Sequence, residues 1–397
     1  MGTGRLSRVR GLAVPQDYRE VAAGLLEDPD LSSFDSAAAV VDHVSRKPAA
    51  IGLVPWEAVT PQVKALAVDG QALLAADEAS IEGYPLAPES AEAPDLEKLQ
   101  RVVVGGDVVL DRGQSYAVIQ QGRGIDFPMD GGYAAITSRA RVPNPYAPSE
   151  FVNEFTAERR GGAGAVRKYL SSADLTLANL ENPVVEDAVW HPEGTAFTGD
   201  PRLLPILDQA GIDGATLGNN HILDAGAPGI SETKRYLEGA GISYSGAGMD
   251  LSSAREPMVF DLGGVKLGVL SYLDIPGYEW AWATDNSAGT APLREEVMKE
   301  DIERLRAEVD VVLVMPHWGT EYLATPEPGQ VELAHAAVDA GADLVVGGHA
   351  HWIKGIEVYE KSPIFYGVGN FFFDQSWSEN TSTGIFAEIT LYDDQPI

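Results

Sequence analysis

Polar side chains with metal-binding or proton-transfer chemistry recur in this sequence directly after short apolar runs. In α/β sheets, ligands collect at the carboxyl ends of the strands, so these side chains are expected to converge. Imidazoles, carboxylates and an amide oxygen, with no thiolate among them, form a nitrogen- and oxygen-ligand metal site. The residues that follow predicted strands in this way are Asp107, Glu181, Asn220, His221, His317, His349 and His351.

The most specific of these segments is Gly347-Gly348-His349-Ala350-His351. Its glycines allow a close backbone approach, and the His-x-His spacing directs two imidazoles into one cleft if the turn is not a regular strand. Each polar residue alone also has an ordinary explanation as a hydrogen-bonded histidine, a helix cap or a turn residue. Their repetition at successive strand ends favours the metal site.

Apolar runs and helical stretches alternate after about residue 100, which predicts a layered α/β domain with sheets covered by helices. The last two runs have no helix between them, so part of the sheet is expected to be antiparallel. Residues 113–165 show little periodicity and predict either a lid or an insertion without a role. Strands are expected at 101–104, 175–177, 215–217, 265–270, 309–314, 344–346, 364–368 and 384–391, and helices at 201–209, 228–238, 293–307 and 330–340.

The segment YPLAPESAEAPDLEK, residues 84–98, contains three prolines and has no helical or strand period, so it predicts a linker. We therefore expect an N-terminal segment at 1–83, the linker at 84–98 and the chemistry-bearing domain at 99–397. The N-terminal segment predicts a helix at Ala37–Val44 and a strand at Ala50–Val54. Its sequence weakly resembles parts of periplasmic solute-binding domains, and its role is open.

Composition excludes several classes of protein. The 397 residues include 28 Lys and Arg against 59 Asp and Glu, a net charge of −31 that repels nucleic acid. The absence of cysteine excludes disulfides, thiolate metal sites and cysteine nucleophiles. No stretch is apolar enough to predict a membrane-spanning helix, and the first 30 residues lack the apolar core of a secretory signal.

Six ordered motifs resemble the bacterial CapA family of poly-γ-glutamate capsule synthesis proteins, which are related to calcineurin-like metallophosphoesterases. The resemblance runs from about Arg101 to Ala387. It implies a four-layered α/β/β/α metallophosphatase-like sandwich with a dinuclear site of divalent ions, among which Mn, Fe, Zn and Mg stay open. The motifs are GGDVVLDR, ANLENP, GNNHILDAG, PHWGTEY, GGHAHWIKGIEVY and IFYGVGNFFFD.

The resemblance also implies a role for each residue. Asp107 and His351 belong to the first metal, Asn220, His317 and His349 to the second, and Glu181 bridges the two. His221 faces the substrate as a proton donor or transition-state stabiliser. Asp224 either orients His221 or caps a helix, and Arg112 either binds phosphate or forms a surface salt bridge.

One departure from the wider superfamily concerns the first metal. The usual Asp-x-His reads Asp107-Val108-Val109, and valine cannot bind a metal, so the first site is one imidazole short. Asp111 also stands where many relatives have glycine.

Two functions remain open at this point. One is a metal-dependent hydrolase that acts on a phosphoester or an anionic cell-surface polymer, with two ions to bind the anion and activate water. The other is a non-catalytic assembly component of poly-γ-glutamate synthesis with a structural or polymer-binding metal site. An anionic polymer would require local cations, from metal or from Arg112 and Lys354. By analogy with the family, the protein is expected outside the cytoplasmic membrane, with membrane capsule-synthesis proteins as partners.

Overall fold

The computed structural model describes residues 11–25, 30–68, 71, 84, 86, 95, 98–130, 134–143, 151–159 and 164–397. The chain divides into two compact units, Met1–Gln100 with Ile389–Ile397 and Arg101–Glu388. The predicted linker at 84–98 lies almost wholly outside the described residues, so a domain boundary at residue 99 stays a prediction. No helix in the described part of the chain has the length and apolarity that a bilayer crossing needs.

The N-terminal unit contains a parallel pair of short strands and two helices. Ser36 begins α2 because its hydroxyl accepts a hydrogen bond from the Ala39 amide at 3.2 Å. The predicted helix at Ala37–Val44 is therefore confirmed. The elements are β1 (Leu12–Pro15), η2 (Gln16–Tyr18), α1 (Arg19–Leu25), β2 (Leu31–Phe34), α2 (Ala37–Ser45) and η3 (Trp56–Ala58).

The predicted strand at Ala50–Val54 is wrong, since the segment makes a single β-bridge, between Gly52 and Ala13. Pro55 follows at once and has no N–H to extend a ladder, and the 3-10 helix η3 begins at Trp56. Apolar content alone thus predicted a strand where the chain pairs at only one residue.

The first large sheet has seven strands, in the order β19-β18-β3-β6-β7-β8, and β17 pairs with β3. Strands β3, β6, β7 and β8 are parallel, so their carboxyl ends lie at one edge. Asp107 pairs in register with Asn179 on one side and Asn370 on the other. The strands are β3 (Leu99–Val108), β6 (Leu175–Leu180), β7 (Gly214–Thr216), β8 (Ser243–Ser245), β17 (Asn370–Phe372), β18 (Ala387–Tyr392) and β19 (Gln395–Pro396).

The second large sheet has six strands, in the order β10-β11-β13-β14-β16-β15. Its central strands β11, β13, β14 and β16 are parallel, whereas β10 and β15 join antiparallel at the two edges. The expectation of a partly antiparallel sheet is confirmed by these edge strands, whereas the two last predicted strands, 364–368 and 384–391, lie in different sheets. The strands are β10 (Met258–Leu262), β11 (Val265–Asp274), β13 (Val311–Trp318), β14 (Leu344–Val346), β15 (Ile356–Tyr359) and β16 (Ser362–Phe365).

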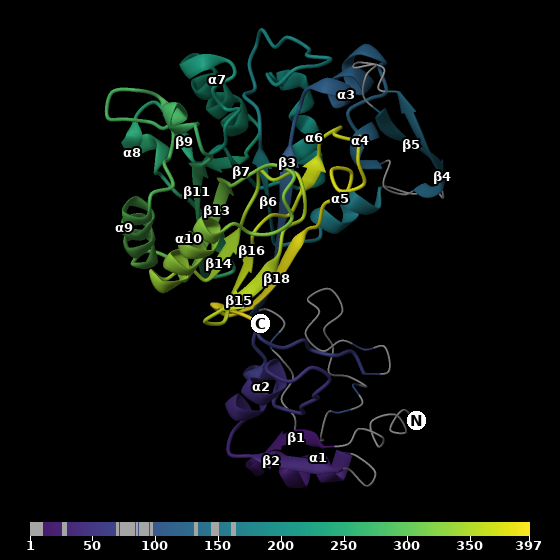
Figure 1. Ribbon diagram of the computed structural model, residues 1–397, viewed down its shortest axis with the longest axis vertical. Coiled ribbons are helices and arrows are strands. Elements are labelled where there is room, and N and C mark those ends of the chain that lie inside the picture. The colour runs from purple at the N-terminus through teal and green to yellow at the C-terminus, as the bar shows by residue number, and fades with distance from the viewer. Residues whose placement is uncertain are drawn as a thin grey trace. The chain divides into compact units, whose positions relative to one another are not determined.

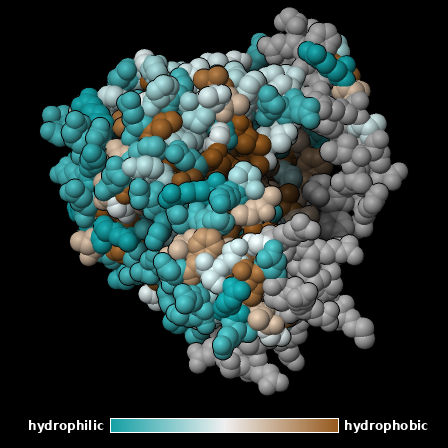
Figure 2. Space-filling model, turned by 60° about the horizontal axis from the view of Figure 1, so that its bottom comes forward, coloured by the Kyte–Doolittle hydropathy of each residue, from teal (hydrophilic) through white to brown (hydrophobic). Residues whose placement is uncertain are grey.

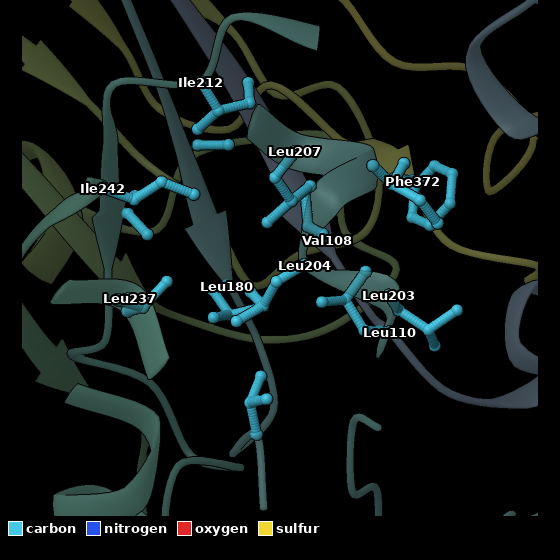
Figure 3. Packing of buried hydrophobic residues seen from close by; sticks show 14 of the residues in the cluster. Val108, Leu110, Leu180, Leu203, Leu204, Leu207, Ile212, Leu237, Ile242 and Phe372 are labelled. Carbon is cyan, nitrogen blue, oxygen red and sulfur yellow. The ribbon is translucent and has the colours of Figure 1, made fainter. Parts of the chain in front are cut away.

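Helices cover the outer face of each sheet. On the first sheet, Val108 and Leu180 from the strands pack with Leu207 of α6 and Leu237 of α7 in one buried apolar cluster (Figure 3). Each fully buried leucine of this kind contributes about 1.5–3 kcal/mol. The second sheet is covered by α9 and α10 (Figure 1). The helices are α5 (Ala165–Leu170), α6 (Pro205–Ala210) with η7 (Pro201–Leu203) before it, α7 (Gly226–Gly239), α9 (Glu295–Arg306) and α10 (Pro328–Asp339).

The inner faces of the two sheets pack against each other. Strand β8 contacts β10 and β11, and one small cavity of about 10 Å³ is lined by Asn179 and Thr216 from the first sheet and Met315 and Val346 from the second. The domain therefore has the four-layered α/β/β/α arrangement. Shorter elements between the layers are β9 (Ala247–Gly248), α8 (Leu251–Ala254), η8 (Glu279–Ala281) and β12 (Gly289–Thr290).

The expectation of little regular structure at 113–165 is wrong. The stretch contains two short helices, a π-helix and an antiparallel pair of strands. The alternation of apolar Ile136 and Val142 with polar Thr137 and Arg139 is the period-2 signal that the neighbouring Gly and Pro obscured. The elements are α3 (Arg112–Ser115), η5 (Tyr116–Gln120), α4 (Phe127–Asp130), β4 (Ala134–Pro143) and β5 (Phe151–Arg159).

On the coloured part of the face in Figure 2, hydrophilic side chains predominate, with hydrophobic patches among them. This surface agrees with the excess of carboxylates in the composition.

Candidate metal centre

The predicted metal ligands lie at neighbouring strand ends of both sheets. Asp107 is the last residue but one of β3, and Glu181 directly follows β6. Asn220 follows β7, and His317 lies near the end of β13. Because these strands are parallel neighbours within their sheets, their ends meet at one edge.

The loop after β14 supplies two imidazoles from unusual backbone. His349 and His351 have φ of 80° and 52°, a left-handed conformation that ordinary residues avoid. Such strain costs about 1–3 kcal/mol per residue and gathers at functional sites. The ring centroids of the two histidines lie 6.1 Å apart, and that of His317 lies 4.9 Å from His349.

Two groups of side chains have the spacing of metal ligands, and they share Glu181. The first group is Asp107, Glu181 and His351, and the second contains Glu181, His317 and His349, with the ligand atoms of each group within 4.8 Å of one another. Glu181 Oε1 lies 3.3 Å from His317 Nε2 and 3.8 Å from His351 Nε2. A shared carboxylate between two groups is the geometry of a dinuclear centre.

Asn220 joins the second group, because its Oδ1 lies 2.9 Å from His317 Nε2. This second site therefore has four oxygen and nitrogen donors, namely Glu181, Asn220, His317 and His349. The first site has three, since Val109 is completely buried and has no donor atom in its side chain.

Several of these atoms are buried without a hydrogen-bond partner. They are both carboxylate oxygens of Glu181, Asp107 Oδ2 and His349 Nδ1. A buried carboxylate oxygen without a partner is costly, and a bound cation removes that cost. The donor set thus fits divalent metal ions, and the lack of thiolates favours metals that accept nitrogen and oxygen ligands.

Burial and neighbouring charges shift the pKa values of the site in different directions. Burial, reinforced by electrostatic interaction with the neighbouring His317 and His351, lowers the pKa of His349 well below its usual value, which favours the neutral, metal-binding form. Burial also acts to lower the pKa of His351, but the charges of Glu181 and Asp107 outweigh it and raise that pKa to about 9. A metal at the first site must therefore displace a proton from His351 at neutral pH.

Burial acts in the opposite direction on Asp107, where it alone would raise the pKa of the carboxyl group. The neighbouring His351 and His317 outweigh that effect and hold the pKa below its usual value. The carboxylate is therefore ionised and ready to bind a cation.

His221 lies beside Asn220 and is oriented by Asp224. The Nδ1 of His221 lies 2.9 Å from Asp224 Oδ2, which also accepts a hydrogen bond from the Phe197 amide at 2.8 Å. Helix α7 begins at Gly226 with Ala225 as its N-cap, so Asp224 does not cap this helix. Of the two interpretations of Asp224, its contacts match the orienting one.

Arg112 reaches the same neighbourhood. Its guanidinium donates to the Gly194 carbonyl and lies 4.9 Å from the ring centroid of Phe197. That ring is 4.6 Å from the imidazole of His221. Arg112 is thus placed on the His221 side of the centre, where a substrate anion could meet it.

Lys354 does not offer a surface charge to a polymer, contrary to expectation. It is 3% exposed, and its ammonium donates to Gln330 Oε1 at 2.9 Å. Burial lowers its pKa. The ammonium therefore faces α10 inside the domain.

Three asparagines that the sequence analysis did not single out lie next to the predicted ligands, and two of them, Asn179 and Asn370, contact a ligand side chain directly. Asn179 donates to Asp107 Oδ1 at 2.8 Å, and Asn219 donates to Asn179 Oδ1 at 3.1 Å. Asn370 Oδ1 lies 2.9 Å from His351 Nδ1. The available signal was an amide within an otherwise apolar strand, in the motifs ANLENP and IFYGVGNFFFD.

A family model described as "Bacterial capsule synthesis protein PGA_cap" matches residues 101–375, which include every residue of the candidate centre. The chain belongs to this family. The PGA_cap match begins within β3 and ends just after β17. It therefore covers the second large sheet, the first one apart from β18 and β19, and the strand ends that carry the site.

Two curated relatives of this PGA_cap chain are named for capsule polymer synthesis. "Capsule biosynthesis protein CapA" of Bacillus anthracis is 32% identical over 230 residues, 55% of this chain and 55% of that protein. "PGA biosynthesis protein CapA" of Bacillus subtilis is 30% identical over 242 residues, 59% of this chain and 63% of that protein. The matches thus span less than two thirds of either relative.

Solved structures with partial likeness include two from other bacteria. The NAD nucleotidase of Haemophilus influenzae has a TM-score of 0.41 at 13% identity, covering 75% of this chain and 48% of that one. A hypothetical protein from Thermus thermophilus has a TM-score of 0.43 at 16% identity, covering 75% of this chain and 96% of that one. TM-scores this low support no conclusion about the function of this chain.

Proposed function

We propose that this PGA_cap protein is a metal-dependent hydrolase of capsule polymer metabolism that cleaves a phosphoester or a bond in an anionic cell-surface polymer. The observation that carries the proposal is the placement of His221, oriented by Asp224, next to two ligand groups that share Glu181. A metal that served structure alone would need no oriented imidazole beside it.

Each residue has a task in this proposal. Asp107, Glu181 and His351 would hold one divalent ion, and Asn220, His317 and His349 would hold the other with Glu181 between them. When bound, the ions would supply positive charge that polarises the substrate anion and lowers the pKa of water.

The remaining residues handle the proton and the anion. His221 would deliver a proton to the leaving oxygen through Nε2, because Asp224 engages its Nδ1. Arg112 would hold a second anionic oxygen of the substrate on the side of Phe197. The net charge of −31 repels polyanions elsewhere on the surface, so binding would be confined to this cationic site.

The names of the Bacillus relatives suggest poly-γ-glutamate as the polymer. The carboxylates of such a chain suit metal ions and a guanidinium, in the same way as phosphate oxygens do. We place the protein, on this analogy, outside the cytoplasmic membrane with membrane capsule-synthesis proteins as partners and without a nucleic-acid partner.

A second candidate is a non-catalytic assembly component whose metal site binds polymer or supports structure. The observation that favours it is Val109, which leaves the first site with three donors. The two candidates differ in whether metal-loaded protein turns over a substrate.

The test uses the full chain, loaded with Mn²⁺ after chelator treatment. Metal content is measured first, then hydrolysis of an aryl phosphate and the chain length of poly-γ-glutamate after incubation. The hydrolase proposal expects wild type to cleave one of the two substrates and His221→Ala, with equal metal content, to cleave it about 10²–10⁴-fold more slowly. Metal-loaded wild type that cleaves neither would favour the assembly component, and a stable wild type that takes up no metal would overturn the metal centre.

A further inference from the structure

Asn370, the first residue of β17, contacts the imidazole of His351, a predicted ligand of the first site, at its Nδ1 edge. Its Oδ1 lies 2.9 Å from His351 Nδ1, and the side chain is 8% exposed. Asn370 is not a member of the ligand group of Asp107, Glu181 and His351, so the metal site by itself assigns no role to Asn370.

The orientation of the Asn370 amide follows from its other partners. Its Nδ2 donates to the Thr381 carbonyl at 3.0 Å and to Gln375 Oε1 at 3.2 Å. Since both partners are acceptors, the amide nitrogen must face them and Oδ1 must face the imidazole. His351 Nδ1 therefore carries a hydrogen in this pair, and Nε2 is the nitrogen whose lone pair binds an ion once its proton has been displaced.

Asp107 Oδ2 is the competing acceptor for the same hydrogen. It lies 3.2 Å from His351 Nδ1, farther than Asn370 Oδ1, and is left without a hydrogen bond. With the hydrogen directed to Asn370, this Asp107 oxygen remains available to a cation. The ring places Nε2 at 3.8 Å from Glu181 Oε1, the shared carboxylate.

The backbone holds Asn370 in place by the same strand pairing that holds Asp107. The two residues are register partners in β17 and β3, and the Asp107 amide donates to the Gly369 carbonyl at 3.2 Å. A Cβ at Gly106 would lie 1.8 Å from that carbonyl oxygen, so only glycine permits this approach. The pairing of β3 with β17 therefore fixes Asp107 and Asn370 relative to each other.

We propose that Asn370 is a positioning residue of the first metal site, which sets the tautomer of His351 and directs its Nε2 at the ion. The inference rests on the proposed metal centre and deepens it. It would explain how a site with three donors, and no imidazole at Val109, could hold an ion. Residues that orient a metal-bound histidine in this way contribute about 10–100-fold to metal affinity.

The test compares Asn370→Asp with Asn370→Leu, which have nearly the same size. Both lose the amide donor to Thr381 and Gln375, but only aspartate retains an acceptor for the His351 hydrogen. Mn²⁺ affinity of each full-length variant is measured by chelator competition. We expect Asn370→Leu to weaken the first site about 10–100-fold with the second site unchanged, and Asn370→Asp to bind nearly as wild type does.

Thr233→Val is the control for loss of a buried polar group. Thr233 is buried outside both ligand groups, and its hydroxyl accepts a hydrogen bond of 2.8 Å from the Val184 amide. It should lower stability and leave both affinities unchanged. If Asn370→Leu does not fold, Asn370→Ser takes its place, since a serine hydroxyl is too short to reach His351.

Equal weakening in Asn370→Asp and Asn370→Leu would overturn the inference, as would an Asn370→Leu variant that keeps both ions. A wild type that binds one ion, unaffected by either substitution, overturns it too. A wild type that binds no ion overturns the proposed function together with the inference. The proposed function survives the first three results.

Discussion

Asp224 Oδ2 lies 2.9 Å from Nδ1 of His221 and is held there by the Phe197 amide, so the imidazole has one fixed edge and one edge free for substrate. Asn220, a predicted metal ligand, directly precedes this histidine in the chain. The contact between Asp224 and His221 therefore holds the proposed proton donor beside the candidate metal centre, in an orientation that does not depend on a bound metal.

We expect His221→Ala to slow turnover by about 10²–10⁴-fold with the metal content unchanged, because a proton donor is lost and no ligand is. Asp224→Asn should also slow turnover, because the amide carries no negative charge. The decrease should be smaller than in His221→Ala, since the amide still contacts His221. Elemental analysis and steady-state kinetics on the same preparations measure both effects. A loss of metal in His221→Ala would show that the residue is a ligand.

His317→Ala should remove the metal of the second site and the activity together. The imidazole lies within 3.3 Å of both Asn220 Oδ1 and Glu181 Oε1, so its loss opens the centre of this donor set. Metal content after dialysis and residual activity are the measurements, with His335→Ala as the control. His335 lies on α10 and pairs with Glu357, outside both ligand groups. Equal metal loss in His317→Ala and His221→Ala would contradict the assignment of Asn220-His221.

The sequence predicted the layered α/β architecture because alternating strands and helices carry strong period-2 and period-3.6 signals. Strand β14 was predicted at its observed bounds, Leu344–Val346, since glycine ends it sharply. The polar residues at strand ends were predicted to converge, and the structure brings them together. Their roles as ligands stay predictions.

Other features depend on contacts between distant segments and gave no local signal. The left-handed backbone of His349 and His351 could not be predicted locally, because non-glycine residues rarely adopt this conformation and no residue type in the segment signals it. The contact of Asn370 with His351 joins residues 19 positions apart through the pairing of β17 with β3. Pattern reasoning also missed the β4–β5 pair, where Pro143 ends the first strand.

Limited proteolysis should cut within residues 84–98 and leave a fragment that folds on its own. The reason is the proline content of this stretch and the position of every site residue beyond it. Mass spectrometry locates the cut, and urea unfolding of the fragment tests its cooperativity. Loss of cooperative unfolding after the cut would refute the predicted boundary.

Replacing β4 and β5 with a short glycine linker should lower turnover and leave the metal content unchanged, if this stretch is a lid. The two strands pair only with each other among the described residues, so their removal breaks no pairing with the large sheets. Metal analysis and kinetics on the deletion variant decide between the alternatives. Unchanged turnover would make the stretch an insertion without a role in the reaction.

Val109→His should strengthen the first site. Val108 and Leu110 point into the apolar cluster beneath the helices, so Val109 and Asp107 point to the opposite face, where the ligands lie. An added imidazole there should raise Mn²⁺ affinity about tenfold or more, equivalent to about 1.4 kcal/mol. Overpacking of a completely buried position should lower the free energy of unfolding by about 1–3 kcal/mol in the metal-free form.

The matched control for this substitution is Val109→Phe, which adds a ring of similar size without a donor atom. Chelator competition with Mn²⁺ gives the affinity of each site, and urea unfolding in chelator gives the stability. We expect both variants to lose stability but only Val109→His to gain first-site affinity. Equal first-site affinities in Val109→His and Val109→Phe would mean that the side chain at position 109 does not face the ion. Val109 would then not be the reason that the first site has only three donors.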